Sequence, residues 1–319
     1  MTTENVNEVI NEKSEILFLY ENTYSIPNGD PFTGEQRYDE ETKKILVSDV
    51  RIKRFIRDYL LYLNKEIFVW NDRSNIEGNE SGAAARVKSL KEKYKNDESV
   101  FLKDKNNKIT KNFDTKKLLQ KCSDVRLFGG ISTEEGDAVN LTGPVQFSLL
   151  NPSLNEVDLR THQNTSHFVS KGENKQGAIG TTTVVPYAII QIHGWINPRS
   201  AIQTNLTNAD LVDMNKGLWH GINEANTRTK NNQNSVLLIE IIYNNDLGKV
   251  YGADRLIQIR PKDNKRGEQL RSMDDYDFDF SKLINIATSE KIKEIRYYTE
   301  IESIDLIFSG KSKFVKLTI

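Results

Sequence analysis

The stretch TTTVVPYAIIQIHGWI at residues 181–196 carries the strongest strand signal in the sequence. Its residues are β-branched or aromatic almost throughout, and such residues fit the pleated surface of a sheet. Two apolar runs share this character, ILFLY at 16–20 and SVLLIEIIY at 235–243. We therefore expect core strands in these three segments, and a further strand in GPVQFSLL at 143–150.

Two helices are expected between these strands. Ser48 and Asp49 can cap the first, because a short side-chain oxygen accepts from the free backbone amides of a helix start. Thr207 or Asn208 can start the second, which would run to about Asn226. The apolar residues at helical spacing are Val50, Ile52, Ile56, Tyr59, Leu60 and Leu63 in the first helix and Leu211, Met214, Leu218, Trp219 and Ile222 in the second. The resulting order, strand, helix, strand, strand, helix, strand, is that of a ferredoxin-like or RRM-like sheet, so the expected fold class is α+β.

The remaining segments are more polar. Residues 71–136 are rich in lysine and are expected to form an insertion off the main core, with helical stretches at 83–95 and 113–123. Residues 151–182 contain few core residues, which predicts a loop or a hairpin. Further short strands are predicted at 67–70, 254–260, 295–299 and 304–309.

Length and charge leave the class of protein open. At 319 residues the chain can bury one large core or two modest ones. Its 44 basic and 45 acidic residues give a formal net charge of -1, so bulk composition does not indicate a nucleic-acid-binding protein. Basic residues nevertheless gather in 43–65, 86–126 and 160–175, and a chain without net charge can carry a basic groove.

Other features concern the compartment. No apolar run approaches the roughly 20 residues that a membrane span needs, and Met1 to Ser14 lacks the basic start and apolar middle of a secretory signal. Cys122 is the only cysteine, which excludes an internal disulfide and a cysteine-based metal cage. We expect a cytoplasmic protein with no membrane partner.

Positive charge gathers directly behind the loop PNGD at 27–30. Arg51, Lys53, Arg54 and Arg57 lie within seven residues of one another, in the first predicted helix. Its first-turn amides and its arginines could together hold phosphate oxygens, although helices also carry such charges on an ordinary solvent face. Asp30, at the tip of the loop, is the one carboxylate in a position that could be catalytic, and the alternative for it is an Asx-type turn.

Two glycine-containing stretches are weaker candidates. DVRLFGGI at 124–131 places Arg126 near Phe128, Gly129 and Gly130, and glycines allow a backbone to approach a ligand closely. LTGPVQF at 141–147 supplies the hydroxyl of Thr142 and the amide of Gln146, which suit sugar and phosphate contacts. Ordinary turns explain both stretches equally well.

Histidine positions do not indicate a metal site. His162 and His167 are the only histidines close in sequence, and no cysteine, aspartate or glutamate joins them at usual zinc spacing. We also find no Ser-His-Asp or Cys-His arrangement, so the expectation is a protein with no metal, no cofactor and no catalytic residues.

In combination these motifs resemble a known family. PNGDP, VSDVRIKRFIRDYL, DVRLFGG, LTGPVQFS and VPYAIIQIHGWINP occur in the same order and at similar separation in the backbone subunits of type I-B CRISPR Cascade complexes, the Csh2 group of the Cas7 family. The resemblance covers roughly 14–243. It implies an RRM-like palm, a helical fingers insertion and a thumb, with copies stacking along one CRISPR RNA whose bases stay available for pairing with target DNA.

Mapped onto this chain, the resemblance divides it into 1–70 as the first part of the palm, 71–136 as fingers, 137–150 as a palm strand, 151–182 as thumb, and 183–319 as the rest of the palm with a C-terminal extension. The partners it implies are CRISPR RNA, target DNA, other copies of the chain and other Cascade subunits. The residues expected to bind RNA are Asn28, Gly29, Asp30, Arg51, Lys53, Arg54, Arg126, Phe128, Gly129, Gly130, Thr142, Gln146, Arg160, His162, Lys171 and Lys175.

Two other functions remain open at this point. Related type III backbone subunits use a loop aspartate to cut bound target RNA, and Asp30 is the only candidate here. A general single-strand-binding module would need aromatic residues stacked on the surface of the sheet. The aromatic residues of 16–20 are expected to be buried, which argues against that module.

Overall fold

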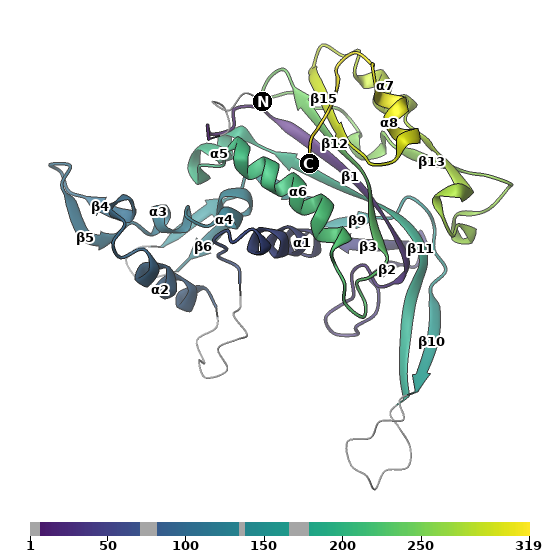
Figure 1. Cartoon of the computed structure of the whole chain (residues 1–319), viewed down its shortest axis with the longest axis horizontal. Coiled ribbons are helices and arrows are strands. Elements are labelled where there is room, and N and C mark those ends of the chain that lie inside the picture. The colour runs from purple at the N-terminus through teal and green to yellow at the C-terminus, as the bar shows by residue number, and fades with distance from the viewer. Residues whose placement is uncertain (1–6, 71–81, 134–137, 166–178) are drawn as a thin grey trace, which may run out of the picture.

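The computed structural model describes residues 7–70, 82–133, 138–165 and 179–319. Helices and strands are mixed along the chain, and a sheet of seven strands forms its centre (Figure 1). The strand order is β10-β11-β1-β12-β15-β16, and β8 pairs with the edge of β11 opposite to β1. These strands are β1 (Ser14–Ser25), β8 (Val145–Phe147), β10 (Arg160–Thr165), β11 (Ile179–Ile196), β12 (Gln233–Tyr243), β15 (Ile292–Tyr298) and β16 (Phe314–Lys316).

The centre of the sheet is β1, which pairs antiparallel with β11 and β12. Residues 16–20 are all fully buried because both faces of the sheet are covered. Phe18 points into the core on one face, whereas Leu17 and Leu19 belong to the core on the other. Alternate strand residues point to opposite faces, so a continuous apolar run is what a sheet covered on both sides requires. The strands predicted at 16–20, 181–196 and 235–243 are confirmed.

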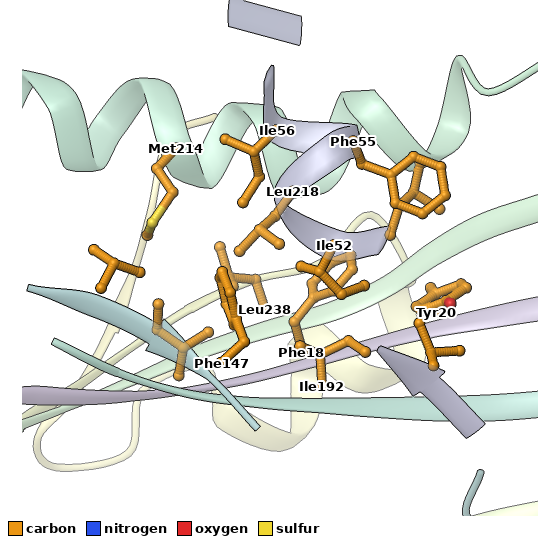
Figure 2. Packing of buried hydrophobic residues seen from close by; sticks show 14 of the residues in the cluster. Phe18, Tyr20, Ile52, Phe55, Ile56, Phe147, Ile192, Met214, Leu218 and Leu238 are labelled. Atoms are coloured by element: carbon orange, nitrogen blue, oxygen red, sulfur yellow. The ribbon is translucent and has the colours of Figure 1, made fainter. Parts of the chain in front are cut away.

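Two helices cover one face of the sheet, α1 (Asp49–Tyr62) and α6 (Asn208–Asn223). Figure 2 shows Ile52, Phe55 and Ile56 of α1 pointing into a core that they share with Met214 and Leu218 of α6. Both predicted helices are confirmed. Thr207 caps α6 and forms a reciprocal capping box with Asp210.

The expected buried face of α1 is corrected at one position. Val50 is 67% exposed, and Phe55 is buried instead. A residue two positions before Ile52 lies on another side of a 3.6-residue helix, whereas Phe55 and Ile56 follow it by three and four. Val50 therefore lies on the side of α1 that also carries Arg54.

The opposite face of the sheet is covered by the C-terminal part of the chain, shown in yellow-green and yellow in Figure 1. The expected strand at 304–309 is wrong, because this segment forms α8, in which Ile304 and Phe308 are buried one helical turn apart. The strand expected at 254–260 starts only at Gln258. The elements are η3 (Ala253–Arg255), β13 (Gln258–Pro261), η4 (Gly267–Gln269), η5 (Met273–Asp275), β14 (Tyr276–Asp279), α7 (Ser281–Ile286) and α8 (Glu302–Phe308).

The insertion has a small core of its own around Val87, Leu90 and Leu118. Its helices and hairpins form a separate lobe at one end of the molecule (Figure 1). The strand expected at 67–70 is wrong, because Ile67 and Phe68 are buried without pairing in a sheet. The elements of this region are α2 (Ala83–Lys93), η2 (Glu98–Val100), β4 (Phe101–Lys103), β5 (Ile109–Phe113), α3 (Thr115–Leu119), α4 (Ser123–Phe128), β6 (Gly129–Ser132) and β7 (Val139–Thr142).

Residues 151–182 divide into two parts. Asn155 and Val157 are buried against the body of the protein, whereas β10 and the start of β11 form a hairpin that extends away from it (Figure 1). The remaining elements are α5 (Pro198–Thr204) and a small sheet of β2 (Tyr38–Asp39), β3 (Lys44–Ser48) and β9 (Leu150–Pro152). Within the described ranges, no helix is both long enough and apolar enough to span a bilayer.

Candidate nucleic-acid interface

A groove of about 1090 Å³ runs along the N-terminal half of α1. Its walls are the loop around Asn28, the segment 69–70 that precedes the insertion, and 149–150 at the start of β9. Four arginines line it, Arg37, Arg51, Arg54 and Arg57. The loop and the basic helix, which are adjacent in the sequence prediction, thus share one concave surface.

Asn28 fixes the loop to the start of α1. Its Oδ1 accepts hydrogen bonds from the backbone N–H and the Oγ–H of Ser48, at 2.7 and 2.8 Å. Its own N–H donates to Oε1 of Gln36, at 2.9 Å. Ser48 is the N-cap of α1, but its side chain makes no capping hydrogen bond to the helix. Asn28 therefore holds the loop against the helix start, and the residue is only 7% exposed.

Asp30 forms the Asx-type turn. Its Oδ1 accepts from the backbone amides of Phe32 and Thr33, at 2.9 and 3.4 Å. Its Oδ2 lies 3.3 Å from Nη1 of Arg37. The carboxylate thus holds the shape of the loop, and Arg37 enters the groove beside it.

The arginines of α1 differ in how they are held. Arg54 is half exposed, pairs with Asp58 at 2.7 Å and lies 5.5 Å from the centre of the Trp70 ring. Arg51 lies over the Phe55 ring at 3.9 Å, and its Nε is buried without a hydrogen-bond partner among the described residues. Burial is the main cause of a lowered pKa of Arg51. Among the residues that the structure describes, Arg51 consequently has no anion at hydrogen-bond distance.

The other two basic residues of α1 have internal partners. Lys53 donates to Asp49 at 3.0 Å and to Oε1 of Gln146 at 3.4 Å. Arg57 pairs with Asp124 at 2.8 Å, and the two side chains are 12% and 1% exposed. Asp124 also accepts the N–H groups of Phe68 and Val69, at 2.7 and 3.0 Å. This carboxylate joins the insertion to α1 and to one wall of the groove.

Arg126 and the glycines beside it serve the packing of the chain itself. Arg126 makes a double hydrogen bond to the Asp210 carboxylate at 2.9 and 2.6 Å, which links α4 to the start of α6. Gly129 has a φ of +81°, and a Cβ there would lie 2.1 Å from the Leu141 carbonyl oxygen. Phe128 is buried against Phe147. The close backbone approach expected at Gly129 is therefore to the neighbouring strand.

The remaining predicted contacts lie elsewhere. Thr142 is exposed at the end of β7, and Gln146 bonds to the Gly143 carbonyl as well as to Lys53. Arg160 and His162 are exposed on β10 and do not line the groove. Lys171 and Lys175 lie outside the described residues. None of these positions is tested as an RNA contact, so all of them stay predictions.

The sequence prediction missed three groups at the groove. Arg37 enters it because Gly29 pairs with Gln36 and folds the loop back on itself. Trp70, expected inside a strand, is 38% exposed under Arg54, and Leu149 is 74% exposed. Arg37 follows the PNGD loop and Trp70 follows the helix, so both were visible in the sequence as candidates. Only the fold brings them to the same groove. Among the described ranges, no three His, Cys, Asp or Glu side chains are grouped so that they could hold a metal ion.

Comparisons of the sequence with known proteins indicate the same family. The model of a family described as CRISPR-associated protein Cas7 matches residues 12–281. A protein of Haloferax volcanii named CRISPR-associated protein Cas7 is 27% identical over an alignment 321 residues long. The alignment covers 94% of this chain and 87% of that protein.

Solved structures show the same fold at low identity. A chain described as "CRISPR RNA-guided surveillance complex, pre-nicking" superposes with a TM-score of 0.53 at 12% identity and covers 96% of both chains. A second, described as "CRISPR RNA-guided surveillance complex", has a TM-score of 0.53 at 10% identity, over 95% of this chain and 94% of the other.

Proposed function

Because the chain belongs to the CRISPR-associated Cas7 family, we propose that it is a non-enzymatic backbone subunit that binds CRISPR RNA in a type I-B Cascade complex. The Csh2 group is the branch that its sequence motifs resemble. The observation that carries the proposal is the groove along α1, where four arginines meet the loop that Asn28 fixes.

The groove suits a phosphate backbone better than base recognition. Arg37 and Arg54 are partly exposed and both line the groove, and guanidinium groups can bind phosphate oxygens in a bidentate manner. Contacts to phosphate position a strand without reading its sequence. A subunit of this kind orders the guide and leaves its bases to pair with target DNA, a division of labour known from another RNA-guided effector.

The proposed palm is the RRM-like centre of the sheet. Its strands β12, β1, β11 and β8 lie side by side in this order, with α1 and α6 on one face. Four antiparallel strands in this arrangement with two helices follow the ferredoxin-like pattern. Residues 71–136 would be the fingers and the β10–β11 hairpin the thumb. Copies of the chain would stack along the guide within a cytoplasmic complex that includes other Cascade subunits.

The contacts of Asp30 support a structural role for it. Both of its carboxylate oxygens are engaged within its own loop, by two amides and by Arg37. A nuclease mechanism would need this carboxylate to reach a substrate or a bound ion.

The decisive experiment is copurification. The full chain is expressed with a CRISPR array and purified, and the bound nucleic acid is extracted and sized. We expect discrete RNA of guide length.

Arg54→Ala should lower the slope of log affinity against log salt by about 0.7 on a single strand, the value for one lost phosphate contact. The loss of affinity should be equal for unrelated sequences. Arg228→Ala, which removes an exposed arginine that does not line the groove, is the control. An RNA-free protein, or equal slopes for both variants, would refute the proposal.

A further inference from the structure

A second pocket of about 710 Å³ lies on the other side of Arg51. It opens between α1, from Arg51 to Tyr62, and the C-terminal end of α6. Residues 224–227 and Lys230 close it. The two helices meet closely here, because a Cβ at Gly221 would lie 2.5 Å from the carbonyl oxygen of Phe55. We call it the α1–α6 pocket. Arg51 lines both this pocket and the groove, so the two are neighbouring cavities.

The loop that closes the pocket is held by the central strand. The carbonyl of Asn232 accepts the N–H of Thr23 at 3.0 Å, and the carbonyl of Thr229 accepts the N–H of Ile26 at 2.9 Å. Ile26 leads directly into the loop that Asn28 fixes. The position of Lys230 in the pocket is thereby tied to the wall of the groove.

Two cations face each other inside this pocket. Burial, followed by repulsion from Arg51, lowers the pKa of Lys230 to about 8. The Lys230 ammonium donates to Oγ1 of Thr229 at 3.2 Å. Two carboxylates also line the pocket, Asp58, which pairs with Arg54, and the exposed Glu224. Within the described ranges, neither forms an ion pair with Arg51 or Lys230. Two half-buried like charges are unfavourable alone and favourable around an anion.

Aromatic side chains line another part of the wall. The rings of Tyr59 and His220 are stacked at 5.6 Å with an interplanar angle of 26°, and the ring of Tyr62 lies 6.1 Å from that of Tyr59. Tyr62 is 79% exposed. Exposed aromatic faces next to cations are the surfaces on which single-stranded nucleic acids place their bases.

We propose that the α1–α6 pocket binds one nucleotide of the RNA strand held by the groove, with its phosphate between Arg51 and Lys230 and its base against Tyr62 and Tyr59. This inference rests on the proposed function and adds a second contact region to it. Because Arg51 lines both cavities, the two contact regions would be neighbours along one strand. Phosphate and aromatic contacts of this kind do not require a particular base, so the pocket would accept any sequence.

The test is a lysine footprint on the full chain. Acetic anhydride acylates neutral lysines, and mass spectrometry reports the rate at Lys230 relative to Lys249, an exposed lysine that does not line this pocket. We expect poly(U) to slow acylation of Lys230 about tenfold, as occupancy of about nine-tenths implies, and inorganic phosphate to leave the rate nearly unchanged. Equal rates with and without bound poly(U) would overturn the proposal. Protection by phosphate alone as strong as by poly(U) would also overturn it, because the site would then hold a free anion.

Matched variants separate this inference from the proposed function. Lys230→Met should weaken poly(U) binding roughly tenfold, the loss expected for one charged hydrogen bond, and Tyr62→Leu by a similar factor for one lost stacking surface. Arg228→Met removes a charge from the same loop, and Tyr251→Leu removes a 90% exposed tyrosine elsewhere, so both should bind normally. Unchanged affinity of Lys230→Met and Tyr62→Leu, while Arg54→Ala still lowers the salt slope, would refute the pocket and leave the groove. Absence of RNA binding in the parent protein would refute both.

Discussion

The stability of this protein should be sensitive to loss of the buried carboxylate of Asp124. It is fully buried, pairs with Arg57 and accepts the amides of Phe68 and Val69. Asp124→Ala leaves a cation that is only 12% exposed without its partner and two amides without their acceptor. Breaking a buried pair in this way costs about 3 to 5 kcal/mol of stability. Loss of this link should also release the insertion from the wall of the groove.

Urea denaturation measures the free energy of unfolding, and hydrogen exchange measures the local release. We expect Asp124→Ala to lose about 3 to 5 kcal/mol and the amides of Phe68 and Val69 to exchange faster. Asp58→Ala is the matched control, because it removes the partner of Arg54 from an exposed pair on the same helix and should cost about 0 to 1 kcal/mol. The double change Arg57→Met with Asp124→Leu should cost less than the sum of the single changes, since no charge is then left unpaired. If Asp124→Ala costs no more than Asp58→Ala, the reasoning from burial is refuted.

Three further outcomes are expected. RNA affinity should fall as pH rises from about 7 to about 9, because Lys230, with its pKa lowered to about 8, loses its proton in this window; a fall of equal size in Lys230→Met would contradict this. The other titratable groups that line the same pocket are Arg51, Asp58, Tyr59, Tyr62, His220 and Glu224. Assembled complexes given complementary RNA and magnesium should leave it intact, and regularly spaced cleavage that disappears in Asp30→Ala would instead establish a nuclease. Replacing 162–182 by a short turn between Thr161 and Thr183, which face each other across the hairpin, should leave the melting temperature unchanged but prevent regular assembly on RNA; a lower melting temperature would show that the hairpin supports the fold.

The core elements were predictable because their signals are local. The apolar runs of β1, β11 and β12 and the capping residue Thr207 specify their elements through neighbouring residues, and the structure bears them out. Errors occurred where a short apolar run fits both the two-residue repeat of a strand and the 3.6-residue repeat of a helix. Residues 304–309 form a helix, and 67–70 form no strand, because the packing of Phe308 and the acceptor Asp124 decide these segments.

The candidate site was predictable only in part. The loop at 27–30 and the basic residues of α1 stand out in the sequence, and both reach the groove. Their individual roles depend on partners distant along the chain: Arg57 faces Asp124, Arg126 faces Asp210, and Asn28 faces Ser48. These pairs distinguish the cations that stabilise the fold from the cations that remain available to bind a ligand.

By itself, the sequence determined the three core strands, the two helices that cover them and the clustering of positive charge, because hydrophobic period, capping and local charge are properties of neighbouring residues. Only the tertiary structure decided which of those charges are neutralised inside the protein. It also brought Lys230 to Arg51, two residues far apart in the chain, by fixing the loop after α6 to the end of β1. The physical reason is that an ion pair, a cavity and a shifted pKa depend on distance in space and on burial, and both are set when the sheet and its helices pack together.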